Sequence, residues 1–309
     1  MPERLQFVFF NERGLRAGWR LVIFLLIYFC LFSAVVFSLR LAGVRLTIPS
    51  VLTPRFSILN DGGTFLLLLF VSWIMSRIEK RPLAAYGLPI RHEPVISRLV
   101  SGYVLWGFIP LSVCLYAIHV FHGFDFGGPL LHGAQIAFWA ALWFVAFLLV
   151  GFAEEYFLRG YMLYTLADGI GFWPAAIVLA ILFGVGHSAN PGETRVGLVA
   201  TVVFALFASL TLRLTGSLWL AVGAHAGWDW GQSFFYGVSD SGLTAQGHFL
   251  NPSFHGPVWL TGGTVGPEGS VVTLIVWSVL MALFYLVYRN RKQPALIVES
   301  GTAGPLGPM

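Results

Sequence analysis

Long apolar segments follow one another along almost the whole chain, separated by short polar or basic connections. Each segment is long enough to cross about 30 Å of hydrocarbon as an α-helix, a structure that satisfies its backbone hydrogen bonds within lipid. The predicted spans are residues 19–43, 56–77, 98–121, 134–160, 172–189, 196–213, 216–236 and 271–288. The pattern therefore predicts an all-α fold, a polytopic transmembrane helical bundle of about eight spans.

Two of these segments depart from a simple span. Residues 56–77 contain the polar sequence Asn-Asp-Gly-Gly at positions 60–63, so this segment could instead be a short re-entrant piece. A helix that begins at the fourth segment and continues to residue 168 would be about 52 Å long, which is too long for a straight crossing. We expect this helix to tilt, protrude or break, with Gly151 or Gly160 as the candidate position.

Composition supports a membrane protein with one domain. Hydrophobic residues make up 57% of the 309 residues and charged residues only 10%, whereas a soluble domain carries about 25% charged residues. Residues 19–292 are expected to form a single transmembrane domain, because no part outside the apolar segments is long enough to fold separately. Residues 1–18 would be a cytoplasmic N-terminal segment. Residues 293–309, rich in Pro, Gly and Ala, would be a disordered cytoplasmic tail.

The distribution of Lys and Arg predicts the orientation. These residues accumulate on cytoplasmic connections, and most of them fall on one side when eight spans are threaded. The prediction is a multi-pass integral protein of a bacterial inner (plasma) membrane, with both termini in the cytoplasm and residues 237–270 as an extracytoplasmic loop. The net charge of +4 is therefore attributed to topology and to contacts with membrane lipids, and not to nucleic acid.

The fourth apolar segment contains the motif Glu154-Glu155-x-x-x-Arg159. An ionised carboxylate in hydrocarbon costs several kcal/mol unless it is paired or hydrated. Arg159 follows Glu155 by four residues, so the two are predicted to form a structural ion pair on one helix face. Glu154 points about 100° away around the helix and is predicted to be the working carboxylate. The alternative is that both acids are neutralised structural groups in the bundle core.

Two later apolar segments contain further polar groups. His187 ends a Phe-Gly-Val-Gly run, whose small residues permit close helix approach. His225 and Asp229 are four residues apart on one helix face, so Asp229 could orient the imidazole, or both could bind a metal. A buried His–Asp pair that locks two helices together is the structural alternative. Gly223 and Gly227 are expected to leave room beside this pair for a peptide backbone or water.

Counting residues from the cytoplasmic helix ends places these polar groups in one layer, about 13–22 Å deep. We expect them to surround a hydrated cavity that opens to the cytoplasm. Carboxylates and imidazoles are also sufficient ligands for zinc. The cofactor is therefore left open as either none or a divalent metal such as zinc. The possible metal ligands are Glu154, His187, His225 and Asp229.

The three motifs Glu-Glu-x-x-x-Arg, Phe-x-x-x-His and His-x-x-x-Asp occur in this order on successive predicted spans, within residues 151–229. They resemble the motifs of the CPBP intramembrane proteases, also called the Abi or CAAX-protease-like family, whose core would cover residues 134–236 here. The resemblance implies an intramembrane endopeptidase, of either the glutamate type or the metal-dependent type. Its substrate would be a membrane-associated or prenylated-like peptide.

The resemblance also implies roles for individual residues. Glu154 and His187 would activate the attacking water, and His225 and Asp229 would assist the oxyanion or ligate a metal. In the CAAX enzymes the last position is typically Asn, and an ionised Asp cannot donate a hydrogen bond. This departure favours orientation of His225 by Asp229, a protonated Asp229, or metal ligation.

Two other functions would use the same cluster of polar groups. A proton-coupled transporter could pass protons along intramembrane acids and histidines, although the sequence shows no internal repeat of the kind found in many transporters. A non-catalytic immunity or scaffold protein of the same fold would keep the cluster for structural reasons.

Overall fold

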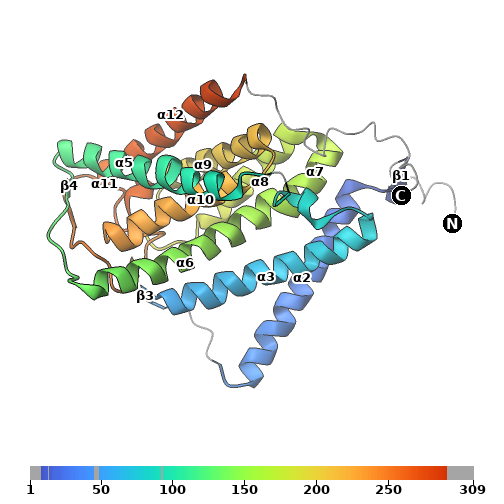
Figure 1. Cartoon of the computed structure of the whole chain (residues 1–309), viewed down its shortest axis with the longest axis horizontal. Coiled ribbons are helices and arrows are strands. Elements are labelled where there is room, and N and C mark those ends of the chain that lie inside the picture. The colour runs from blue at the N-terminus through green and yellow to red at the C-terminus, as the bar shows by residue number, and fades with distance from the viewer. Residues whose placement is uncertain (1–7, 13, 45–48, 92, 291–309) are drawn as a thin grey trace.

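The structure is a computed structural model that describes residues 8–12, 14–44, 49–91 and 93–290, and helices make up most of it (Figure 1). The α-helices are α2 (Ala17–Leu41), α3 (Pro54–Glu79), α4 (Val95–Ser101), α5 (Ile109–Val120), α6 (Ala134–Phe157), α7 (Leu163–Ile170), α8 (Phe172–His187), α9 (Arg195–Thr215), α10 (Trp219–Asp229), α11 (Val258–Thr261) and α12 (Val271–Tyr288). The π-helical stretches are η2 (Gly102–Phe108), η3 (Leu158–Met162) and η4 (Trp230–Phe235), and the 3-10 turns are η1 (Leu83–Tyr86) and η5 (Pro267–Gly269). The tail predicted for residues 293–309 lies outside the described residues.

Short strands in the segments outside the helices form three pairs. Their bounds are β1 (Phe10–Asn11), β2 (Gly14–Leu15), β3 (Val51–Leu52), β4 (Phe124–Asp125), β5 (Thr244–Ala245) and β6 (Ser253–Phe254). Strands β1 and β2 pair with each other, β3 pairs in parallel with β5, and β4 pairs antiparallel with β6. The long segment 236–270 is thereby fastened to the chain before α3 and to the chain after α5.

The predicted polytopic helical bundle is confirmed. Within the described residues, six helical segments are long and apolar enough to cross a membrane. They are Ala17–Leu41, Pro54–Glu79, Val95–Val120, Ala134–Ile170, Arg195–Thr215 and Val271–Tyr288. The shorter apolar helix α8 and the helix formed by α10 with η4 occupy the positions of the two remaining predicted spans.

Helix α3 runs through the polar sequence at positions 60–63 without interruption. Its start is well defined, because Thr53 Oγ1 accepts a hydrogen bond from Phe56 N at 3.2 Å and Pro54 occupies the first turn. The re-entrant alternative for this segment is therefore wrong. The polar residues instead mark a part of the helix that lines a pocket.

The long fourth span breaks at Gly160, one of the two predicted positions. Gly160 has φ −79° and ψ −120°, which is not helical, and it lies within η3 between α6 and α7. A side chain at Gly160 would meet the Tyr156 ring at 2.9 Å. Gly151 remains helical, and the α6 backbone there lies close to the α10 backbone at Val222. The two glycines therefore have different uses, one in a bend and one in a helix contact.

Helix α10 lies directly against η2, and the contact is backbone to backbone. A Cβ atom at Gly223 would lie 2.2 Å from Leu99 O, and one at Gly227 would lie 2.0 Å from Tyr103 O. Gly102 on the facing helix is equally close to Leu220 O, at 2.3 Å. Small residues permit this approach, which drives helix association within lipid. The expectation that Gly223 and Gly227 leave room for a substrate backbone or water is wrong, because the backbones of α4 and η2 fill that room.

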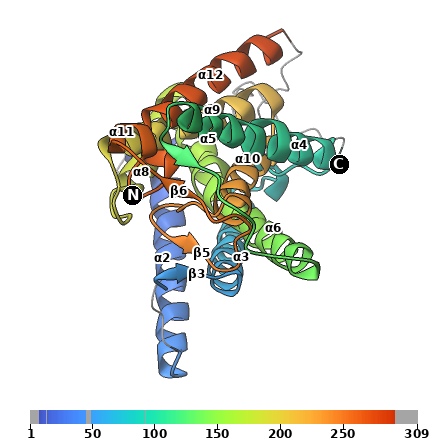
Figure 2. The same cartoon turned by 90° about the vertical axis from the view of Figure 1, so that its left-hand side faces the viewer.

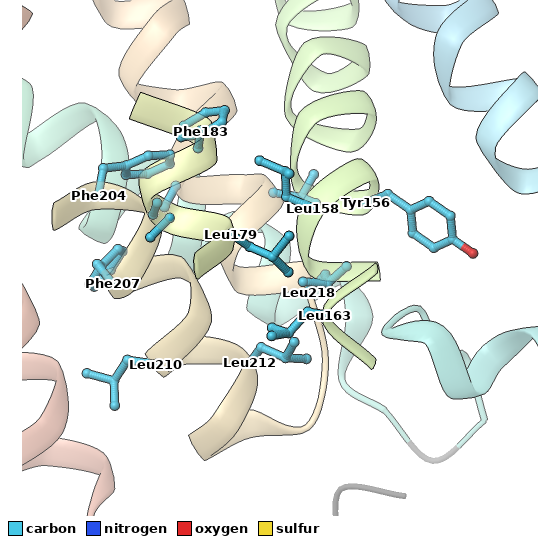
Figure 3. Close-up of a cluster of buried hydrophobic side chains, with 14 of the residues drawn as sticks. Tyr156, Leu158, Leu163, Leu179, Phe183, Phe204, Phe207, Leu210, Leu212 and Leu218 are labelled. Atoms are coloured by element: carbon cyan, nitrogen blue, oxygen red, sulfur yellow. The ribbon is translucent and has the colours of Figure 1, made fainter. Parts of the chain in front are cut away.

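A large apolar cluster joins α8 and α9 to the fourth span and to α10. Figure 3 shows Phe183 of α8 beside Phe204 of α9, and Leu179 of α8 beside Leu158 and Leu163 of the fourth span. Gly184 contributes to this packing, because a Cβ atom there would lie 3.1 Å from Leu198 O. The close approach expected from the Phe-Gly-Val-Gly run is thus present between α8 and α9.

The bundle has two ends, which we name the loop end and the basic end. The loop end holds the ends of α2, α5, α8 and η4, the starts of α3, α6, α9 and α12, and all of segment 236–270. Figure 2 looks onto it and shows β3, β5, β6 and α11 gathered there. The basic end holds the starts of α2, α4, α8 and α10 and the ends of α3, α7, α9 and α12.

Buried polar contacts fasten the helices together at the basic end. Arg20 of α2 forms ion pairs with Glu79 of α3, at 3.0 Å, and with Asp168 of α7. Tyr161 donates a hydrogen bond to the same Glu79, and Arg81 donates one to Tyr164. The first two spans are therefore held to the far end of the fourth span by paired charges.

The contact between α10 and η2 can be tested with glycine substitutions. We expect Gly227→Ala to destabilise the protein by about 1–3 kcal/mol, because the added methyl group overlaps Tyr103 O. Gly186→Ala is the matched control, since nothing lies within 4 Å of a Cβ atom there. Thermal unfolding in detergent measures both, and equal midpoints for the two variants would contradict the close contact.

Candidate active site

A pocket of about 210 Å³ lies among α3, α6, α8, α9, α10 and α12, and segment 236–270 covers one side of it. The pocket brings together all four residues that the sequence singled out as catalytic candidates. These residues are Glu154, His187, His225 and Asp229. Three further acids from other parts of the chain, Asp61, Asp240 and Glu268, line the same pocket.

Glu154 and Glu155 differ sharply in exposure. The Glu154 side chain is 37% exposed and faces the pocket, whereas the Glu155 side chain is 0% exposed. Glu155 Oε1 accepts a hydrogen bond from Arg159 Nη1 at 3.1 Å, so the predicted ion pair is present in the structure. Glu154 is the carboxylate that a water molecule in the pocket can reach.

The His225 ring is held by carboxylates on both of its nitrogens. Nδ1 donates a hydrogen bond to Glu155 Oε1 at 2.9 Å. Nε2 lies 3.4 Å from Asp229 Oδ2 and 3.7 Å from Glu154 Oε2. Since a carboxylate only accepts, the Nδ1 contact fixes the proton on that nitrogen and turns Nε2 toward the pocket. Glu155 thus orients the ring through Nδ1, a contact that the sequence did not indicate, while Asp229 lies beside Nε2.

Glu155 therefore has two partners that come from different helices. The i,i+4 partner Arg159 could be predicted from spacing, whereas His225 is 70 residues away in sequence and no local pattern indicates the contact. The Arg159 guanidinium also lies 4.7 Å from the centre of the Phe183 ring, as a cation–π contact. Two atoms of the pair, Glu155 Oε2 and Arg159 Nη2, are buried without a hydrogen-bond partner among the described residues.

His187 reaches the pocket from the last turn of α8. Its Nδ1 donates a hydrogen bond to Phe183 O at 2.8 Å, because a carbonyl oxygen can only accept. In the neutral ring Nε2 is then the unprotonated nitrogen. The Phe183 ring lies edge-on to the His187 ring, with 4.4 Å between the ring centres. The Phe204 ring lies edge-on to the His225 ring, with 5.1 Å between the ring centres. Both imidazoles are thus set in place by aromatic neighbours and by a hydrogen bond to Nδ1.

Segment 236–270 adds two acids that sequence reasoning missed. Single ligand oxygens of Asp229, Asp240 and Glu268 all lie within 4.8 Å of one another. Asp240 accepts a hydrogen bond from Ser233 Oγ at 2.9 Å, and Glu268 accepts one from Ser241 N at 3.1 Å. The sequence treated this segment as a surface loop, and two isolated acids in a glycine-rich connection gave no signal of a shared site.

The three clustered acids are the compact metal-ligand set among the described residues. Carboxylate oxygens suit hard cations such as Mg²⁺ or Ca²⁺, whereas zinc is usually bound by imidazole or thiolate ligands. Burial raises the pKa of the Asp240 carboxyl to about 6, and burial together with the nearby Asp240 raises the pKa of Glu268 well above its usual range. Proton uptake and cation binding would both reduce the repulsion among the Asp229, Asp240 and Glu268 carboxylates.

Asp61 is the third acid that the sequence did not indicate. It lies two turns into α3, where Asn60 Nδ2 donates a hydrogen bond to Asp61 Oδ1 at 2.8 Å. The sequence signal was an acidic residue within an apolar segment, the same signal that identified Glu154. In the sequence analysis Asp61 counts instead as part of the Asn-Asp-Gly-Gly stretch that suggests a re-entrant piece.

The pocket lies toward the loop end of the bundle. His187 is the last residue of α8, and the lining residues of α3 and α9 come from the first turns of those helices. The opening of this cavity toward the cytoplasm stays a prediction.

The buried ion pair can be tested by a double-mutant cycle. We expect Arg159→Met to destabilise the protein by about 3–5 kcal/mol, because it leaves the Glu155 charge buried without its cation. The same substitution in a Glu155→Gln background should cost much less. Thermal unfolding in detergent gives both values, and equal losses in the two backgrounds would show that the residues do not interact.

The acids of segment 236–270 predict a pH-dependent stability. The Asp240 pKa is higher in the folded protein, about 6, than its ordinary value of 3.8, so its ionisation destabilises the fold as pH rises through this range. We expect Asp240→Asn to raise the unfolding temperature at pH 7.5 but to leave it unchanged below pH 3.8, in buffer that contains a chelator. Asp125→Asn, which removes an exposed carboxylate, is the control. A gain that is the same at both pH values would contradict the assignment.

The comparisons with known proteins agree with this geometry. A family model described as type II CAAX prenyl endopeptidase Rce1-like matches residues 135–231. The matched segment runs from α6 into η4 and contains Glu154, His187, His225 and Asp229. A comparison with curated proteins found no match. The match confirms the resemblance of these residues to the CPBP, or CAAX-protease-like, family.

Proposed function

We propose that the protein is an intramembrane endopeptidase that hydrolyses a peptide bond of a membrane-associated protein or peptide. The observation that carries this proposal is an open carboxylate beside a fixed imidazole. Glu154 faces the pocket, and its Oε2 lies 3.7 Å from His225 Nε2, while Glu155 holds Nδ1 of the same ring. The family match to endopeptidases supports the same reaction class, and no comparable observation favours a transporter or an immunity protein.

Glu154 acts as the general base in this proposal. It takes a proton from a water molecule in the pocket, and the water oxygen attacks the carbonyl carbon of the scissile bond. The carbonyl electrons move onto oxygen, which becomes an oxyanion. The protonated Glu154 then gives its proton to the amide nitrogen as the C–N bond breaks and the carbonyl reforms. His187 accepts a hydrogen bond from the attacking water through Nε2, because its Nδ1 is occupied by Phe183 O.

His225 stabilises the oxyanion. When doubly protonated, the ring donates from Nε2 to the developing negative charge and keeps its Nδ1–H on Glu155. Asp229, 3.4 Å from Nε2, balances the charge of this imidazolium. Asp229 thus acts through His225 and does not itself have to donate a hydrogen bond. The Asp at a position where CAAX enzymes typically have Asn is compatible with the reaction for this reason.

Hydrolysis within a membrane also requires water at the site. The pocket volume of about 210 Å³ is several times the roughly 30 Å³ that one water molecule occupies in the liquid. The carboxylates and imidazoles that line it provide the polar partners that such water needs. A dry, close-packed polar cluster would have opposed the proposal.

A divalent cation would fit beside this machinery. Asp229, Asp240 and Glu268 would hold it through carboxylate oxygens, and it would supply Lewis-acid polarisation of a bound oxygen. In either type of mechanism, Glu154 remains the open carboxylate at the pocket and Glu155 remains the group that positions His225.

The proposed base is tested by Glu154→Gln. This nearly isosteric change removes the proton acceptor, so we expect cleavage of a membrane-anchored reporter peptide in proteoliposomes to fall by about 10²–10⁴-fold. The unfolding temperature should stay close to that of the wild type, because the Glu154 side chain is 37% exposed. Asp61→Asn, which removes another carboxylate from the same pocket, should have a much smaller effect. Cleavage by Glu154→Gln at the wild-type rate would exclude Glu154 as the base.

A further inference from the structure

We propose that Phe204 of α9 is a positioning residue, which fixes the two imidazoles of the pocket relative to each other. Phe204 lies outside the three motifs of the sequence and carries no group that takes part in proton transfer. Its ring contacts the His225 ring and the Phe183 ring, and Phe183 holds His187. The inference rests on the proposed function in giving the two imidazoles different tasks in one reaction.

The first contact of Phe204 is with His225. The two rings lie edge to face, with 5.1 Å between the ring centres and 84° between the ring planes. Aromatic pairs at such distances and angles attract each other and favour a defined tilt. The hydrogen bond from His225 Nδ1 to Glu155 holds one edge of the imidazole, but a single hydrogen bond leaves the ring free to tilt about it. Phe204 restricts this tilt, so that Nε2 keeps its direction toward the pocket.

The second contact of Phe204 leads to His187. The centre of the Phe204 ring lies 6.4 Å from the centre of the Phe183 ring, and Figure 3 shows the two rings next to each other. Phe183 lies edge-on to the His187 ring and accepts the hydrogen bond from its Nδ1. One intermediate ring therefore connects Phe204 to the second imidazole. A change of side chain at Phe204 is expected to move Phe183 and, with it, His187.

Phe204 is itself held in place by a third helix. Only 8% of its surface is exposed, and its ring centre lies 4.8 Å from that of Trp277 on α12. Trp277 also contacts Trp228 of α10, again with 4.8 Å between the ring centres. All three aromatic residues line the pocket. Because side chains packed in this way have little space for other rotamers, Phe204 is a fixed part of the pocket wall.

The spacing of the two imidazoles matters because they serve different atoms of the substrate. In the proposed reaction His187 holds the attacking water and His225 stabilises the oxyanion, so the scissile carbonyl group must fit between them. A displacement of about 1 Å at a reacting centre can lower a rate by about 10²-fold. A residue that sets this spacing affects kcat, whereas a residue that only adds apolar contact with the substrate affects KM.

Substitutions in the full chain, reconstituted in proteoliposomes, test the proposal. Phe204→Leu and Phe204→Met keep an apolar side chain but remove the ring, so we expect kcat for the reporter peptide to fall by about 10–100-fold with KM unchanged. Phe204→Tyr keeps the ring and should retain most of the activity. Phe207→Leu is the matched control, because Phe207 is a buried aromatic residue of the same helix that contacts Trp277 but is not among the described pocket residues. It should lower the unfolding temperature without lowering kcat.

The histidine rings give a readout that does not depend on cleavage. In protein labelled with ¹⁵N at its eight histidines, Phe204→Leu should change the ring-nitrogen signals of both His187 and His225, and Phe207→Leu should change neither. The proposal is overturned if Phe204→Leu keeps the wild-type kcat, if Phe207→Leu or Phe204→Tyr loses as much activity, or if the two histidine signals stay unchanged. A failure of the protease assignment would show in the Glu154→Gln test, and the histidine signals would still decide the role of Phe204.

Discussion

The site depends on one buried carboxylate. Glu155 is fully enclosed and accepts hydrogen bonds from Arg159 on its own helix and from His225 on α10. A carboxylate in this position is stable only because its charge is paired and solvated by donors. In return it fixes the His225 tautomer and holds α6 and α10 in register. Glu155 is thus the structural member of this pair of acids, and its neighbour in sequence, Glu154, faces the pocket.

That pairing requires α10 to lie unusually close to its neighbours. Gly223 and Gly227 let α10 meet the backbone of η2, and Gly151 lets α6 approach α10 from another side. Because these positions lack a Cβ, α10, which carries His225 and Asp229, packs closely between η2 and α6. The glycines do not enlarge the pocket. Through this helix packing they set the position of the His225 ring in the pocket.

Much of the fold was accessible from sequence, because hydrophobic length and helical spacing are local properties. The spans, the break at Gly160, the Glu155–Arg159 pair and the closeness of His225 to Asp229 all follow from such rules. The contact of Glu155 with His225 does not, since it joins residues from distant segments. Asp61, Asp240 and Glu268 were missed for the same reason.

The strand pairs β3–β5 and β4–β6 have a consequence for the part of the chain that carries the catalytic candidates. Residues 135–231 carry the catalytic candidates, yet α3, α12 and segment 236–270 supply the remaining walls of the cavity. The pair β3–β5 joins segment 236–270 to the chain that leads into α3, and the pair β4–β6 joins the same segment to the chain after α5. The matched segment therefore supplies only part of the cavity wall, and the flanking chain completes the enclosure.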